Sequence, residues 1–375
     1  MSPTIPFPII RIGESDPFAR GLRHGRMARD QVAASLRTYH RLFKDFVGIK
    51  WEDAKRIGRR YADAIGAYAP DLLEEIRGVA EGSGNDVDEI LALNARSEIA
   101  LSARLVDGCT AFAVFGTATS GGDVLLCQNW DWRASQRAAF IVLLIERQDD
   151  PSITMLTEAG IIGKIGFNSA GLGACLNAIV TDQVREDGTP LHVVLRRILD
   201  SRNLGDAIQA VGTAGIASAA NFLIAQDRGG ALDIEAVPSD FDVLLPERDM
   251  ICHTNHLRSL RLVTVRDFGK VVLPDSYPRL SRVMRLLDER HGRLSEEEAC
   301  AILRDCDNGP DSICRREDPR DPEGKRLQTV FSVVMNLTRR KLSITDGPPD
   351  AAEYVSVPLA GAWSEPDVVA SRVVL

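Results

Sequence analysis

The spacing of apolar residues changes near Leu105, and this change limits the folds that the chain can adopt. Before it, apolar residues recur at the three- and four-residue spacing of helices, which predicts four helices within residues 18–101. After it, residues 109–116 and 123–132 are short apolar runs on either side of a turn rich in Gly, Thr and Ser, which is typical of a β-hairpin. The chain therefore combines a helical N-terminal segment with a sheet-based remainder.

The rest of the chain continues in groups of strands separated by pairs of helices. Strands are predicted at 140–147, 152–157, 164–168, 173–179, 222–226, 232–237, 250–253, 329–337 and 341–345, and helices at 191–199, 204–211, 277–289 and 295–305. Hairpin connections favour antiparallel pairing, and helices grouped between strand runs favour layers on the sheet faces. We therefore expect an α+β fold, and a sandwich of two sheets with helices outside is consistent with it.

Composition excludes several classes of partner. The net charge is −8 and the arginine pairs are scattered, so we expect no nucleic-acid partner. The longest apolar run, residues 138–145, is far short of a membrane span, and the N-terminus lacks the pattern of a signal peptide. Seven cysteines without framework or zinc-site spacing indicate a cytoplasmic protein with reduced thiols. His253 and His256 are three residues apart, but no third ligand is marked by spacing, so we expect no metal.

Gly108-Cys109 lies where a polar linker meets the first strand of the hairpin. A glycine leaves the carbonyl before Cys109 unshielded, and a thiol can attack such a carbonyl and cut the chain. The product would be Cys109 with a free α-amine, which titrates near about 7.7–8.0 in peptides and can serve as the base for the thiol. The alternative interpretation is that Cys109 is a buried, inert strand cysteine.

The hairpin suggests a neighbour for Cys109. If the turn centres near residues 119–120, the numbers of facing residues sum to about 239 or 240, which places Cys109 opposite Trp130 or Asp131. Asp131 would then hold the Cys109 amine or polarise the cleavage region. A shift of one residue moves the side chain to the other face of the sheet, so this interpretation depends on register.

Four ordered segments carry a resemblance to a known family. They are residues 107–110 (DGCT), 128–132 (QNWDW), 253–256 (HTNH) and 312–315 (SICR), with supporting segments at 70–82, 94–98, 331–337 and 346–349. Together they resemble the acyl-coenzyme A:6-aminopenicillanic acid acyltransferase family, peptidase family C45. The resemblance implies a four-layer αββα N-terminal-nucleophile hydrolase. It also implies self-cleavage into residues 1–108, a helical propeptide or α chain packed on the sandwich, and residues 109–375, the catalytic β chain.

The resemblance also implies roles for single residues. Cys109 matches the nucleophile, Asp131 the acid near it, Asn255 the oxyanion-hole side chain, and Arg315 an arginine for substrate or processing. Without it, Asn255 would be a turn residue with local hydrogen bonds, and Arg315 either a bidentate partner of a substrate carboxylate or a solvated charge. Trp130 and Trp132 can wall an acyl pocket, but aromatic residues in such strands are usually core. The family often has His where this chain has Cys306, which leaves the role of that position open.

Three functions remain. The first is a self-processing amidohydrolase that cleaves an N-acyl amide, such as an N-acyl amino acid or a small peptide, through an acyl-enzyme on Cys109. The second is an acyltransferase that moves an acyl group from acyl-coenzyme A or an amide to an amine. The third is a non-catalytic, unprocessed ligand-binding protein. We expect no cofactor, with a coenzyme A thioester only as a substrate, and we expect the 1–108 chain to remain a partner after cleavage.

Overall fold

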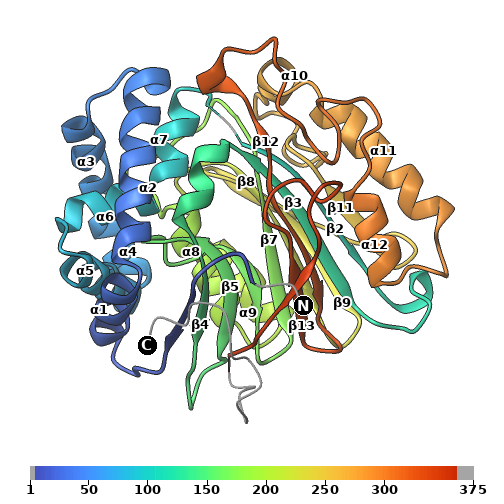
Figure 1. Cartoon of the computed structure of the whole chain (residues 1–375), viewed down its shortest axis with the longest axis horizontal. Coiled ribbons are helices and arrows are strands. Elements are labelled where there is room, and N and C mark those ends of the chain that lie inside the picture. The colour runs from blue at the N-terminus through green and yellow to red at the C-terminus, as the bar shows by residue number, and fades with distance from the viewer. Residues whose placement is uncertain (1–4, 106, 361–375) are drawn as a thin grey trace.

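In the computed structural model, which describes residues 5–105 and 107–360, two β-sheets pack face to face (Figure 1). The first sheet has eight strands in the order β1-β4-β5-β6-β7-β8-β9-β10, and the second has six in the order β11-β2-β3-β12-β13-β14. Strands β2 and β3 of the second sheet pack against β7 and β8 of the first. The strands are β1 (Ile9–Ile12), β2 (Gly108–Val114), β3 (Leu125–Trp132), β4 (Phe140–Ile145), β5 (Ile153–Glu158), β6 (Ile165–Asn168), β7 (Leu172–Ala178), β8 (Ala220–Gln226), β9 (Gly230–Val237), β10 (Asp240–Leu244), β11 (Met250–His253), β12 (Gln328–Asn336), β13 (Lys341–Ile344) and β14 (Val355–Val357).

Helices cover the outer face of each sheet. The N-terminal helices together with α8 and α9 cover the eight-stranded sheet, and α11 and α12 cover the six-stranded sheet. The helices are α1 (Pro17–Met27), α2 (Arg29–Leu42), α3 (Trp51–Arg60), α4 (Ala62–Tyr68), α5 (Pro70–Ser83), α6 (Val87–Asn94), α7 (Arg96–Ser102), α8 (Leu191–Asp200), α9 (Leu204–Thr213), α10 (Gly269–Val272), α11 (Ser276–Glu289) and α12 (Glu296–Leu303). The expected four-layer αββα arrangement is confirmed. No helix in the described ranges has both the length and the hydropathy needed to cross a bilayer.

The N-terminal segment is not wholly helical, which corrects the expectation for residues 1–108. Strand β1 pairs in parallel with β4, with Ile9 opposite Val142, and so adds an edge strand to the eight-stranded sheet. Four residues are too few to show a two-residue alternation, so the apolar start of the chain gave no strand signal. Gly108, the last residue of the expected propeptide, already belongs to β2.

Glycines allow α1 and α5 to cross at very short range. A Cβ atom on Gly21 would lie 1.9 Å from the carbonyl oxygen of Glu75, and one on Gly78 would lie 2.1 Å from that of Phe18. Gly25 and Gly82 make equally close approaches, each one helical turn further along its own helix. Backbone contact at these four positions therefore requires glycine, and it locks the two helices together.

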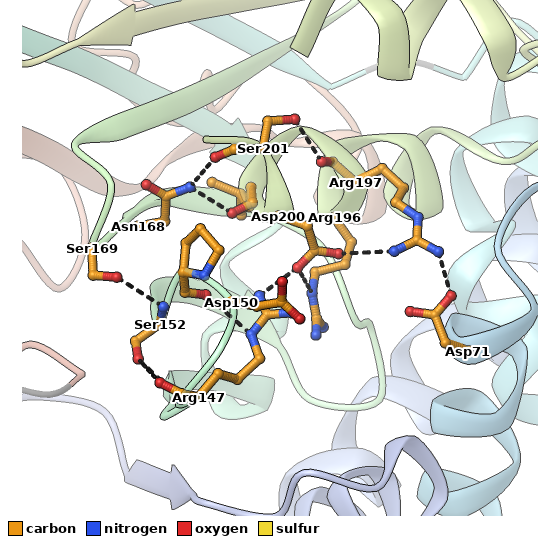
Figure 2. Close-up of polar contacts among 12 residues, drawn as sticks. Asp71, Arg147, Asp150, Ser152, Asn168, Ser169, Arg196, Arg197, Asp200 and Ser201 are labelled. Carbon is orange, nitrogen blue, oxygen red and sulfur yellow. Dashed lines mark hydrogen bonds and ion pairs between the residues drawn. The ribbon is translucent and has the colours of Figure 1, made fainter. Parts of the chain in front are cut away.

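Buried ion pairs fasten the N-terminal helices to the part of the chain after Gly108. Glu75 of α5 accepts hydrogen bonds from Arg20 of α1 (2.7 Å) and from Arg196 of α8 (2.8 Å). Burial opposes ionisation of Glu75, but the charges of Arg196 and Arg20 outweigh it and lower the pKa of Glu75 to about 2. At the rim of the same boundary, Arg197 of α8 pairs with Asp71 of α5 (Figure 2).

Candidate active site

The β2–β3 hairpin sets the position of Cys109. Cys109 lies opposite Trp130 and Gly108 lies opposite Asp131, so the register whose residue numbers sum to about 239 is confirmed and the alternative register is wrong. Opposed residues of an antiparallel pair share a face, and successive residues alternate. The Cys109 thiol therefore points with Trp130 towards the other sheet, whereas the Asp131 carboxylate lies on the face covered by α11 and α12.

Asp131 packs directly against the residue before Cys109. A Cβ atom on Gly108 would lie 2.7 Å from Oδ2 of Asp131, so only glycine leaves room for the carboxylate there. Asp131 is fully buried and accepts a hydrogen bond from Thr329 at 2.7 Å. The residue is thus next to the expected cleavage position, as predicted, but on the opposite side of the strand from the thiol.

The backbone of Cys109 is held by two side chains that are distant in sequence. Its N–H donates to Oδ1 of Asn255 at 2.9 Å, and its carbonyl oxygen accepts from Nη1 of Arg279 at 2.5 Å. Arg279 also donates from Nη2 to Oδ1 of Asn255 at 2.9 Å. The Nδ2 group of Asn255 donates to the carbonyl oxygens of Ala178 (3.0 Å) and Asp107 (3.4 Å). The alternative of a turn residue with local bonds is therefore wrong for Asn255.

A chain of alternating charges lies on the outer face of the six-stranded sheet. Arg315 pairs with Asp131 (3.3 Å), with Asp275 and with Asp311, and Asp275 pairs in turn with Arg279 (2.7 Å). Arg315 is only 5% exposed, so its interpretation as a solvated charge is wrong. The guanidinium links the Asp131 carboxylate to the helix that carries Arg279.

A second charged cluster lies beneath the thiol, between the sheets. Lys164 bonds to Glu158 at 3.1 Å and lies 3.8 Å from the ring centre of Trp130. Arg96 bonds to Glu158 at 3.2 Å and approaches Asp107 at 3.5 Å, and the Trp130 indole donates to Asp107 at 2.7 Å. Burial, followed by the charge of Arg96, lowers the pKa of Lys164 to about 8, although Glu158 and Asp107 act in the opposite direction.

The surroundings of Cys109 favour the neutral thiol. The residue is 1% exposed, and burial raises the pKa of its thiol strongly, with the charges of Asp107 and Asp131 adding to the effect. Lys164 and Arg279 act in the opposite direction. Burial also raises the pKa of Asp131, against the charges of Arg315 and Arg279.

The two tryptophans and two histidines singled out in the sequence are buried and contact other protein groups. Trp130 and Trp132 stack at 6.2 Å between ring centres, and both are buried in the hydrophobic core. His253 bonds to Glu235 at 2.7 Å and His256 to Ser276 at 2.7 Å, so both imidazoles have protein partners.

Sequence reasoning missed Arg279 and Lys164. Arg279 lies in a helix predicted only from its apolar spacing, and Lys164 directly precedes the short strand β6. The only sign in the sequence was a charged residue next to apolar positions. Such residues are also common at the edges of helices, so this sign does not mark a functional site.

Two surface cavities are not lined by Cys109. One of about 1190 Å³ lies between α4, α8 and the loop after β4, where its arginines are paired with carboxylates, as Arg147 is with Asp200 (Figure 2). A smaller one, of about 270 Å³, is lined by Arg279 and by Asp311, the partner of Arg315. The smaller cavity therefore approaches the groups that hold the Cys109 backbone.

A family model and one relative identify the family of this chain. The model of the acyl-coenzyme A:6-aminopenicillanic acid acyl-transferase family matches residues 117–351, which include Asp131, Asn255 and Arg315 and begin after Cys109. The chain is 31% identical over 342 residues to the acyl-coenzyme A:6-aminopenicillanic-acid-acyltransferase 40 kDa form of Emericella nidulans, covering 90% of this chain and 92% of that protein. It is also 22% identical over 206 residues to the beta-alanyl-dopamine/carcinine hydrolase of Drosophila melanogaster, covering 52% of this chain and 51% of that protein.

Solved structures with a similar fold are more distant in sequence. A mutant of the conjugated bile acid hydrolase from Clostridium perfringens is 13% identical with a TM-score of 0.49, covering 70% of this chain and all (100%) of that one. Penicillin V acylase from Agrobacterium tumefaciens is 13% identical with a TM-score of 0.47, covering 64% of this chain and 83% of that one.

Proposed function

The chain belongs to the acyl-coenzyme A:6-aminopenicillanic acid acyltransferase family, and we propose that it is a self-processing cysteine amidohydrolase. The observation that carries this proposal is the clamp around the Gly108–Cys109 peptide. Asn255 holds its N–H, Arg279 holds the next carbonyl, and the Asp131 carboxylate lies against Gly108. Three buried polar groups from three distant segments therefore fix Gly108 and both backbone groups of Cys109, and such positioning favours cleavage at a single bond.

The proposed self-cleavage is a transfer of the Gly108 acyl group from the Cys109 nitrogen to the Cys109 sulfur. The Cys109 sulfur attacks the carbonyl carbon of Gly108, the C–N bond breaks as the C–S bond forms, and the thiol proton moves to the released amine. Water then hydrolyses the thioester, which leaves a carboxylate on Gly108 and regenerates the thiol. The new N-terminus is the amine of Cys109, beside Asn255 and Arg279.

Turnover would use the same thiol on an external amide. The Cys109 amine takes the thiol proton and passes it to the leaving amine, while the acyl group forms a thioester with Cys109. Asn255 is the proposed oxyanion donor, a role worth about 2.7–4 kcal/mol in other enzymes. Its Nδ2 group would then exchange the carbonyl of Asp107 for the substrate oxygen. Trp130, Trp132 and Arg315 are proposed as supports of the substrate site, and the scheme uses no cofactor.

The segment before the cut is proposed to remain bound as a separate chain. Glu75 and Asp71 of α5 pair with Arg196 and Arg197 of α8, and the first of these pairs is buried. Such contacts would persist after a cut at Gly108. We also propose a cytoplasmic location, because the spacing of the seven cysteines is not that of a disulfide framework.

Acyl transfer is the second candidate. The observation that favours it is the 31% identity to an acyltransferase along 90% of this chain. The acyl-enzyme would then be captured by an amine instead of water, with acyl-coenzyme A as the donor. Release of an amine from N-acyl amino acids without added acceptor supports hydrolysis, whereas product formed only with acyl-coenzyme A and an amine supports transfer.

Cleavage is tested by denaturing gel and intact mass. We expect fragments of residues 1–108 and 109–375 from the native sequence and an uncut chain from Cys109→Ala. Cys127→Ala is the matched control, because Cys127 is an equally buried cysteine in the neighbouring strand. An uncut native chain after long incubation, without amidase activity, would support the non-catalytic alternative and overturn the proposal.

A further inference from the structure

Two cysteines and a carboxylate converge outside the proposed active site. Sγ of Cys306 lies 3.4 Å from Oδ2 of Asp350, and Sγ of Cys314 lies 3.1 Å from Oδ1. The three ligand atoms lie within 4.8 Å of one another. Cys306 and Cys314 belong to the loop between α12 and β12, and Asp350 to the turn after β13. We propose that Cys306, Cys314 and Asp350 bind a thiophilic divalent cation, for which Zn²⁺ is the best chemical match.

The distances agree with zinc coordination. Zinc bonds of about 2.0–2.3 Å to oxygen and sulfur give a tetrahedron with edges of about 3.3–3.8 Å. The two sulfur–oxygen separations are close to that edge, so small rotations of the side chains would form the site. Thiolate ligands select Zn²⁺ over hard cations such as Mg²⁺ and Ca²⁺. Cys306 is exposed, which provides an entry path and a water molecule for the fourth position.

The charges around the cluster also balance. Two thiolates and one carboxylate carry three negative charges, of which a divalent cation neutralises two. Arg316 supplies the third positive charge, with Nη2 at 2.6 Å from Oδ1 of Asp350 and Nε at 3.1 Å from Oδ2. A hydrogen-bonded ligand of this kind is the usual outer support of a metal site.

Backbone bonds hold the loop in place independently of a cation. The N–H of Cys314 donates to the carbonyl of Asp305 at 2.9 Å, and the N–H of Gly309 donates to that of Cys306 at 3.1 Å. Arg304 donates to the carbonyl of Pro349 at 3.0 Å, which ties the end of α12 to the turn that carries Asp350. The ligands are therefore preorganised. The spacing of seven residues between the cysteines, with a third ligand far along the chain, explains why the sequence gave no metal signal.

The test is metal binding by the full chain under reducing conditions. The protein is stripped with a chelator, reloaded with Zn²⁺ or Co²⁺ and freed of excess metal. We expect one equivalent of bound metal, and a Co²⁺ form with thiolate-to-cobalt charge-transfer absorption. Cys306 is exposed, so Cys306→Ser should not disturb the fold. This variant should weaken metal binding at least tenfold and reduce the charge-transfer absorption. Cys300→Ser, a change at a partly buried cysteine of α12, should alter neither.

Two further variants separate ligands from a structural effect. Arg316→Met should lower the affinity by about 10–100-fold while keeping the charge-transfer absorption. Asp350→Asn should also weaken binding and keep the absorption, because both thiolates remain. Equal metal retention by the Cys306→Ser/Cys314→Ser double variant would overturn the proposal. So would a native chain that retains neither Zn²⁺ nor Co²⁺ under these reducing conditions.

Discussion

Replacement of Gly108 by alanine tests the packing of Asp131 against the cleavage position. The added Cβ atom would lie 2.7 Å from Oδ2 of Asp131, 3.1 Å from its Cβ and 3.3 Å from its Cγ. Real Cβ atoms do not come within 3.0 Å of other atoms, so the carboxylate must move. Gly108 is not among the residues with a positive φ, so alanine meets no backbone strain and the contact with Asp131 is the main unfavourable effect.

The magnitude follows from what holds Asp131. Its carboxylate is fixed by Thr329 and Arg315, and rotation away from the new methyl group would break at least one of these bonds. A hydrogen bond to a charged group contributes about 1.5–3 kcal/mol. If the strand moves instead, overpacking costs about 1–3 kcal/mol. The two routes together place the loss in the free energy of unfolding at about 1–3 kcal/mol.

The assay is urea unfolding in a Cys109→Ala background, where every chain stays uncut. Gly13→Ala is the matched control, because nothing lies within 4 Å of its new Cβ atom, and it should change stability by less than about 0.5 kcal/mol. In an Asp131→Ala background the cost of Gly108→Ala should fall, because the contacts with Oδ2 and Cγ are lost and only the 3.1 Å contact with the Cβ atom remains. A cost that is unchanged by Asp131→Ala, or no larger than that of Gly13→Ala, would refute this reasoning.

Three further predictions concern the groups around the thiol. Arg279→Lys should slow self-cleavage at least tenfold in gel time courses, because a lysine ammonium cannot make the four hydrogen bonds of the Arg279 guanidinium. The control is Arg282→Lys on the same helix, which should not slow cleavage, because Arg282 pairs with Asp305 instead. Asn255→Ala should lower kcat for amide substrates by about 10²–10³-fold with little change in KM, measured on chains already cut. Lys164 has a pKa of about 8 when folded and 10.5 as its ordinary value, so the unfolded chain binds more protons between these values. Its contribution to stability therefore rises with pH there, by up to about 1.4 kcal/mol per pH unit. The stability difference between the Cys109→Ala protein and its Lys164→Met variant should follow this rise in urea titrations, and a flat difference would contradict it.

The sequence predicted the strands around the site because the hairpin has a strong local signal. Two apolar runs and one turn were enough to place Cys109 opposite Trp130 within one residue. Register then decides which face each side chain occupies, and that depends on the second sheet and on the covering helices. Hence Asp131 was predicted as a neighbour of Cys109, although its carboxylate lies on the other side of the strand.

Long-range partners were beyond the reach of local patterns. Arg279 meets Cys109 across 170 positions of sequence, and Lys164 meets Trp130 only after β6 has joined the other sheet. Helix propensity and apolar spacing say nothing about which carboxylate an arginine will meet. The short edge strand β1 was missed for a related reason, since its pairing with β4 supplies the structure that its own four residues do not specify.

The charge network gives Asp131 a different kind of role from direct contact with the thiol. Asp131 pairs with Arg315, Arg315 with Asp275, and Asp275 with Arg279, which alone of the four bonds to the Cys109 carbonyl. Removal of one member of a buried ion pair leaves its partner uncompensated, at a cost of about 3–5 kcal/mol. Asp131 would therefore act on the proposed cleavage position by packing against Gly108 and by holding the two arginines in place. Cys314 directly precedes Arg315. A cation bound at the proposed site would therefore also help to hold the segment that carries Arg315, in addition to the ion pair between Arg315 and Asp131.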